Sequence, residues 1–170
     1  MLNRHRIYIF FVCIFFMIHM MVIISCDNNR KDTIVDTFWL ENKEKLKKAA
    51  KKLKSIYKEI NINRVYIDSI VIDSKEISLK EVKQSNLEFS DIIIDLINTA
   101  KELNASITIN NGYIYFFFSG GVLKSDFFLL NLFDGNENSF DRFKNEIDKM
   151  EYTVLSQKKI DTNWFFIRTD

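Results

Sequence analysis

The sequence predicts one α+β domain over residues 36–170, with a largely antiparallel sheet of about six strands and three helices. Three segments place apolar residues at helical spacing, and two β-prone runs flank an Asn-Gly pair that is typical of a tight hairpin. The chain has 170 residues, of which 47% are hydrophobic and 28% are charged, so it is not disordered overall. This length supports one domain with its own core.

The first expected helix follows Asp36 and Thr37, either of which can cap a helix. Apolar residues then recur at helical spacing: Leu40, Leu46, Ala49, Ala50, Leu53, Ile56, Tyr57 and Ile60. The opposite face carries Lys43, Lys45, Lys47, Lys48, Lys51, Lys52 and Lys54. This face could attach to anionic lipid, at about 1 kcal/mol per lysine near the surface. The intervening Glu41, Glu44 and Glu59 favour a simple solvated face.

Residues 64–73 are rich in Val and Ile and predict a strand. Ser78 and Glu81 form a capping-box pattern that predicts one short helical turn. A second full helix is expected to begin at Phe89 or Ser90, and Asn104 is a suitable C-terminal stop.

The clearest local pattern is a hairpin of residues 106–110 and 113–118 around Asn111-Gly112. Gly120-Gly121 marks another reversal before a strand over 127–133, a loop over 134–138 and a third helix over 139–150. Residues 152–156 and 164–168 predict a closing hairpin. The expected core includes Ile109, Phe116, Phe118, Phe128 and Val154.

The N-terminus has the pattern of a secretory signal. Arg4 and Arg6 precede an apolar run over 7–24, and a fully polar segment begins at Asp27. The junction, Ile23-Ile24-Ser25-Cys26, resembles the lipobox of bacterial lipoproteins, although Ile23 stands where Leu is commonest. The resemblance covers only the first 26 residues.

This resemblance implies a lipid attachment site at Cys26. In that family the Cys thiol is acylated with diacylglycerol and the signal, here residues 1–25, is removed. Residues 26–35 would then form a lipidated tether, with the body facing the periplasm or the cell exterior. Asp27 resembles the inner-membrane retention signal of some enteric bacteria. An uncleaved anchor stays an alternative, because 18 apolar residues span roughly 27 Å.

Cleavage changes the chemistry that the body has available. Removing 25 of the 170 residues leaves 145, with 22 basic and 23 acidic side chains and a formal charge of −1. His5, His19 and Cys13 leave with the signal, which excludes Ser-His-Asp triads, Cys-His dyads and Cys/His zinc sites from the body. The four glycines match no phosphate-binding loop, and the charge near zero argues against a nucleic-acid partner.

Two further kinds of site have weak support. Asp134, Glu137 and Asp141 could form a calcium loop, but their spacing is not that of an EF-hand, and a polar turn with Asn138 or Ser139 as a helix cap explains them as well. No motif marks a carboxylate pair for glycoside cleavage. We therefore expect no catalytic residue, metal or cofactor.

Aromatic side chains are the remaining candidates for a binding surface. Tyr113, Tyr115 and Phe117 share the face opposite Ile114, Phe116 and Phe118, and Trp39, Trp164 and Phe165 lie elsewhere. An exposed aromatic stripe would be a protein-binding surface, but a helix could equally cover it.

These observations favour an envelope lipoprotein whose body is a non-enzymatic protein-binding module. Its expected partners are the membrane, through the lipid anchor, and another protein. Small single-domain lipoproteins without catalytic residues often resemble immunity or inhibitor proteins that neutralise a toxin or a hydrolase, and this is a class-level analogy. The alternatives are an accessory lipoprotein that docks onto an envelope complex and a carboxylate-based envelope hydrolase.

Overall fold

The computed structural model describes residues 34–85, 89–119, 126–133 and 137–170. The chain forms two compact units, Met1–Phe38 and Trp39–Asp170. Residues 34–38, the described part of the first unit, are helical. Cys26, Gly120-Gly121 and Asp134 lie outside the described residues.

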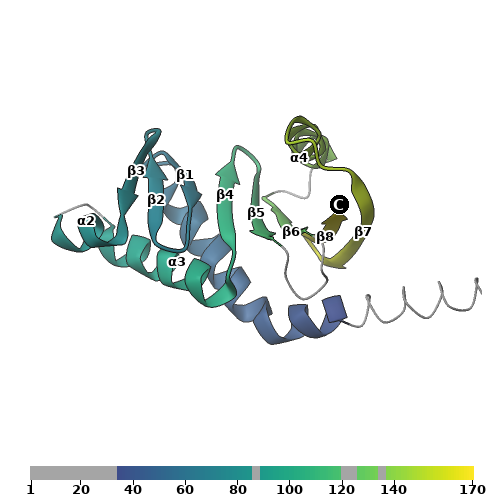
Figure 1. Cartoon of the computed structure of the whole chain (residues 1–170), viewed down its shortest axis with the longest axis horizontal. Helices are drawn as coiled ribbons and strands as arrows, with labels where there is room; N and C mark the ends of the chain where they lie inside the picture. The colour runs from purple at the N-terminus through teal and green to yellow at the C-terminus, as the bar shows by residue number, and fades with distance from the viewer. Residues whose placement is uncertain (1–33, 86–88, 120–125, 134–136) are drawn as a thin grey trace, which may run out of the picture. The chain divides into compact units, whose positions relative to one another are not determined.

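The second unit contains one antiparallel sheet of eight strands in the order β3-β2-β1-β4-β5-β6-β8-β7 (Figure 1). The strands are β1 Ile62–Val65, β2 Ser69–Ile72, β3 Lys75–Ser78, β4 Ser106–Asn110, β5 Tyr113–Phe118, β6 Phe127–Leu132, β7 Val154–Asp161 and β8 Trp164–Thr169. The labelled helices are α2 Leu79–Gln84, α3 Ser90–Leu103 and α4 Glu137–Lys149. Residues 39–56 form a further helix, here called the N-terminal helix.

The predicted α+β class and antiparallel sheet are confirmed, and the strand count rises from about six to eight. One reason is that the strand expected over 64–73 is two strands. The chain reverses between Val65 and Ser69, where the amide of Tyr66 donates to the carbonyl of Ser69 at 2.8 Å. The other reason is β3, which lacks an apolar run and forms by pairing with β2.

Several predicted element ends agree with the structure. Ser78 and Glu81 form the expected capping box of α2. Asn104 ends α3 in a left-handed conformation. Gly112 takes a φ of 109° in the turn between β4 and β5, a conformation that glycine adopts without steric cost.

Other predicted ends differ. Residues 34–56 are helical, so Asp36 and Thr37 lie inside the helix rather than at its cap, and Ile60 lies beyond its end. α4 begins at Glu137, which places Asn138 and Ser139 inside that helix as well. The closing hairpin is longer than expected, because β7 extends to Asp161 through its pairing with β8.

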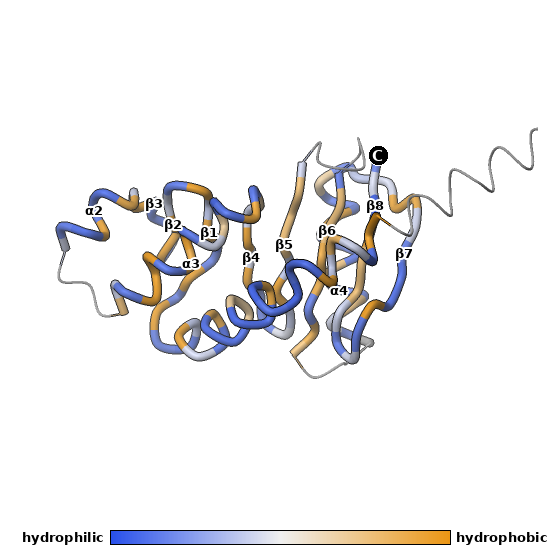
Figure 2. Tube along the Cα trace, turned by 90° about the horizontal axis from the view of Figure 1, so that it is seen from below, coloured by the Kyte–Doolittle hydropathy of each residue, from blue (hydrophilic) through white to orange (hydrophobic). Residues whose placement is uncertain are grey.

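Both faces of the sheet contribute to the core, and helices pack on each. α3 contacts β1 and β2, whose side chains Val65 and Ile70 are fully buried. Trp39 of the N-terminal helix contacts Trp164 of β8 with ring centroids 5.2 Å apart. We call this side of the sheet the first face. Figure 2 shows that the inner strand β6 is hydrophobic along most of its length, whereas much of the edge strand β7 is hydrophilic.

Four of the five predicted core residues are buried, namely Ile109, Phe116, Phe118 and Phe128. Val154 is only half-buried, because it begins an edge strand. Within the described part of the chain, no helix is both long enough and apolar enough to cross a membrane.

Candidate binding groove on the second face of the sheet

α4 packs on the face of the sheet opposite the first face, here called the second face, and covers its β5–β8 half. Phe143 and Ile147 of α4 are fully buried against Tyr113, Tyr115 and other residues of β5, β6 and β8. Phe117 is half-buried at the border of this cluster. The alternative in which a helix covers the aromatic stripe is therefore confirmed, and an exposed stripe is wrong.

A carboxylate of α4 organises the polar edge of this cluster. Glu146 accepts hydrogen bonds from the hydroxyl of Tyr113, from the hydroxyl of Tyr115 at 2.9 Å and from Nδ2 of Asn110 at 2.7 Å. Burial raises the pKa of Tyr115 to about 12, and burial followed by the bond to Glu146 raises the pKa of Tyr113 further. Both hydroxyls are therefore protonated donors, and the network fixes α4 to β4 and β5.

The β1–β4 half of the second face lies beside α4 and carries polar side chains. Strand register places Glu76, Val71, Arg64, Thr108 and Tyr115 in one row across β3, β2, β1, β4 and β5. Register partners in a sheet point to the same side. This row therefore runs from an acidic residue on the edge strand to a tyrosine beside α4.

Two cavities open along this row and share Ser106 and Phe117 in their linings; together we call them the groove. The Arg64 cavity has a volume of about 310 Å³ and reaches Met150 and Tyr152 after α4. The Glu76 cavity has a volume of about 500 Å³ and includes the β1–β2 turn.

Arg64 is the basic residue of the groove. Its Nε donates to Oγ1 of Thr108 at 3.1 Å and its Nη1 donates to the hydroxyl of Tyr66 at 3.2 Å. The side chain is half-buried, yet none of the ion pairs among the described residues includes it. A partly desolvated guanidinium without a carboxylate is an incomplete electrostatic arrangement that a bound anion would complete.

The other end of the groove has the opposite charge. Asp68 and Glu76 line the Glu76 cavity, and its described lining contains no Lys or Arg. The Glu76 carboxylate accepts a hydrogen bond from Oγ of Ser69. Ile67 at this end and Met150 at the other are 41% and 37% exposed, and they are two of the four exposed large hydrophobic residues that the structure describes. The groove therefore combines separated charges with apolar rims.

No pattern in the sequence indicates this groove. Arg64 lies in a run that predicts only a strand, and Glu76 lies in a segment without a predicted element. The residues that did stand out are placed differently: Cys26, Asp134 and the side chain of Glu137 lie outside the described residues, and Asp141 is exposed. In the described ranges, no group of three or more His, Cys, Asp or Glu side chains could hold a metal ion.

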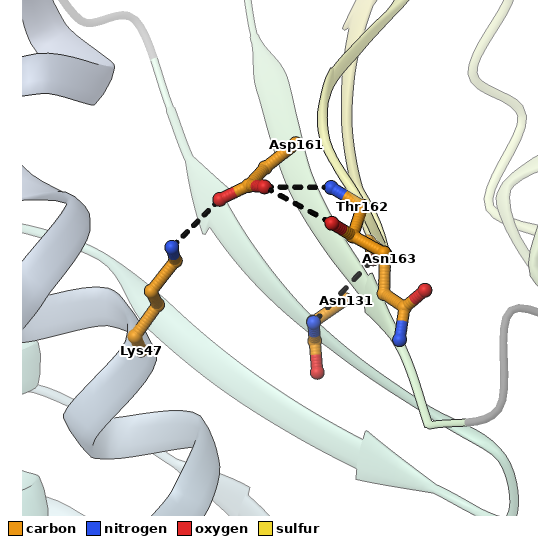
Figure 3. A network of polar contacts seen from close by, with 5 residues as sticks. All are labelled: Lys47, Asn131, Asp161, Thr162 and Asn163. Carbon is orange, nitrogen blue, oxygen red and sulfur yellow. Dashed lines mark hydrogen bonds and ion pairs between the residues drawn. The ribbon is translucent and has the colours of Figure 1, made fainter.

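The lysine-rich face of the N-terminal helix is partly used for internal ion pairs. Lys45 pairs with Glu102 at 2.8 Å, Lys52 pairs with Asp95, and both acids belong to α3. Lys47 reaches Asp161 at the end of β7 at 2.7 Å (Figure 3). These contacts favour the interpretation of this face as a solvated helix surface that also docks the helix.

Figure 3 shows what surrounds the Lys47 ion pair. Asp161 also accepts from the amide of Thr162 at 2.7 Å, and the pKa of Asp161 is lowered by Lys47 first and then by Thr162. Asn131 donates to the carbonyl of Asn163 at 3.4 Å. This cluster ties the β7–β8 turn to the first face and opens into none of the cavities of the groove.

Comparison of the chain with protein-family models, with curated proteins and with solved structures finds no match. The fold and the groove are therefore interpreted from their own geometry.

Proposed function

We propose that this chain is a membrane-anchored envelope lipoprotein whose body is a non-enzymatic protein-binding module. The observation that carries the proposal is the groove on the open half of the second face. It combines a half-buried Arg64, which has no carboxylate partner among the described residues, with exposed apolar side chains, Ile67 and Met150. Met and Arg are enriched at protein–protein interfaces, and an apolar surface beside polar groups is typical of them.

Our specific proposal is an immunity or inhibitor protein that neutralises a toxin or a hydrolase at the envelope. The lipobox-like segment that ends at Cys26 supports anchoring, which would concentrate the module where such an attack occurs. The hydrogen bonds of a nearby acid support binding over catalysis. Glu146 is held by three donors, so it acts as a structural acceptor.

The anchor is tested by metabolic labelling with radioactive palmitate in a bacterial host. The wild-type chain is expected to take up label, and Cys26→Ser is expected to lose it. Cys13→Ser is the matched control and should label as the wild type does, because it leaves Cys26 intact. Label that persists in the Cys26→Ser chain would refute the attachment site.

The binding function is tested by affinity purification of the tagged full-length chain from detergent-solubilised envelopes. A stoichiometric complex with one secreted toxin or hydrolase, which the chain inhibits in an activity assay, is the expected result. Recovery of resident envelope subunits only would instead identify an accessory lipoprotein. Hydrolysis by the purified chain that disappears with single acid-to-amide substitutions would overturn the non-enzymatic proposal.

A further inference from the structure

We infer that the groove binds an extended segment of the partner protein that carries one acidic and one basic side chain two residues apart. The inference rests on the proposed protein-binding function and adds to it the surface and the chemistry of the partner. Four features of the described residues carry it: the row geometry, the unpaired arginine, the acidic end and the apolar rims.

The row geometry sets the distance between the two charges. Arg64 of β1 is the register partner of Val71 of β2, and Val71 is the register partner of Glu76 of β3. Adjacent strands lie about 4.8 Å apart, so the Cα atoms of Arg64 and Glu76 are separated by roughly 10 Å. Side chains two residues apart point to the same side of an extended segment and lie about 7 Å apart. The long side chains of Arg64 and Glu76 can span the remaining distance.

The Arg64 end of the groove is suited to a carboxylate. A guanidinium has five N–H donors in a rigid fork. Its hydrogen bonds to Thr108 and Tyr66 use Nε and one N–H of Nη1. Tyr115 also interacts with this guanidinium. Because no acid of the described chain pairs with Arg64, an incoming carboxylate would gain charge-assisted hydrogen bonds without displacing an internal partner.

The Glu76 end is suited to a lysine or an arginine. Asp68 and Glu76 are both exposed, and both line the same cavity. Ser69 occupies one hydrogen-bonding position of the Glu76 carboxylate, which can accept several more. A partner with the same charges in reversed positions would place an acid against two acids, so the groove also selects direction.

The middle and the rims of the groove favour a polypeptide over a small ion. Phe117 lines both cavities, so an apolar side chain of the bound segment would lie on an aromatic ring beside Arg64. Ile67 and Met150 extend the apolar surface beyond the two charged ends. An inorganic anion would satisfy Arg64 alone and would leave these apolar side chains in water.

The test uses the full-length chain in non-ionic detergent and fluorescence anisotropy with four heptapeptides that carry a neutral fluorophore. Two peptides contain Glu and Lys two residues apart, in either order, and the other two replace Glu or Lys by Gln. One of the two doubly charged peptides is expected to bind about tenfold tighter than either singly charged peptide. Equal binding of all four peptides, or no binding up to about 1 mM, would overturn the inference.

Variants of the chain assign the two charges to their ends. Arg64→Met should lower the affinity for the doubly charged peptide to that of the peptide lacking Glu. Glu76→Gln should lower the affinity for the doubly charged peptide toward that of the peptide lacking Lys. Arg64→Lys should keep most of the preference for the doubly charged peptide over the singly charged ones. Lys51→Met removes an exposed charge from the N-terminal helix and should change nothing. Circular dichroism melts verify folding, and an unchanged preference in a folded Arg64→Met chain would refute the assignment.

The outcomes also separate this inference from the proposed function. If a toxin or hydrolase partner is captured and binds Arg64→Met and Glu76→Gln as tightly as wild type, the groove inference fails and the function stands. If the peptides bind as expected but no inhibited partner exists, the groove chemistry stands and the immunity function fails.

Discussion

Replacing Phe143 by Ala tests whether α4 is an integral part of the fold, since α4 borders the groove. Phe143 is fully buried, and its ring contacts the rings of Tyr113, Tyr115 and Phe128 at centroid distances of 5.8, 5.4 and 5.6 Å. Truncating a buried Phe to Ala costs about 3–5 kcal/mol, including the cavity that remains. Three ring contacts place this site toward the upper part of that range, at about 4 kcal/mol.

The assay is urea unfolding of the full-length chain, followed by tryptophan fluorescence. Trp39 and Trp164 contact each other on the first face, so their signal reports loss of the whole unit rather than detachment of α4 alone. A loss of about 4 kcal/mol is a large part of the 5–15 kcal/mol typical of a domain. The fluorescence midpoint should therefore shift strongly toward lower urea.

Leu40→Ala is the matched control, because Leu40 is 63% exposed on the N-terminal helix. It should change the free energy of unfolding by less than about 0.5 kcal/mol. Phe143→Ala could instead lower the free energy of unfolding from fluorescence by less than about 1 kcal/mol while amide exchange in α4 becomes fast. In that case α4 unfolds independently of the rest of the unit. That result would refute its role as a fixed wall of the groove.

Three further predictions concern the turn, the tyrosine network and the Lys47 ion pair. Gly112→Ala should destabilise the fold by about 2 kcal/mol or more, because the φ of Gly112 is 109° and a Cβ there would lie 2.6 Å from Oγ of Ser139. A change below about 0.5 kcal/mol in thermal unfolding would contradict the turn geometry. Burial raises the pKa of Tyr115 from 10.0 to about 12, so its protonated form stabilises the fold fully below pH 10, and about 2–3 kcal/mol is lost as the pH rises from 10 to 12. Tyr115→Phe should flatten this loss in urea melts at pH 9–12, and an unchanged slope would speak against the shift. Lys47→Met should cost no more than about 1 kcal/mol, since the side chains of the Lys47–Asp161 pair are 44% and 32% exposed; a loss above about 2 kcal/mol in the same melts would show that this ion pair is worth more than its exposure implies.

The sequence predicted the elements that depend on local chemistry. The Asn111-Gly112 turn, the Ser78 and Glu81 capping box and the Asn104 stop all appear where expected, because turn and cap preferences are set by neighbouring residues. β3 was missed because its residues carry no strand pattern and pair only through the register of β2. Val154 was placed in the core on its apolar character, but an edge strand leaves it half-buried.

The groove could not be predicted in the same way. Arg64, Glu76 and Met150 are far apart in the chain, and none of them belongs to a motif. Arg64 becomes notable only because the sheet brings it next to Thr108 and Tyr66, while no acid in the described ranges pairs with it. Burial and the absence of a counter-charge are properties of three-dimensional packing.

The sequence by itself determined the α+β class, the antiparallel central hairpin and the lack of histidine after residue 19, which limits the chemistry of the body. It also supplied the lipobox-like segment on which the anchoring proposal depends. Only the tertiary structure decided that α4 covers Tyr113 and Tyr115, whereas two cavities of the described chain open beside Arg64 and Glu76. The physical reason is that periodicity shows which residues share a face of a strand, whereas strand order and helix packing determine what covers that face.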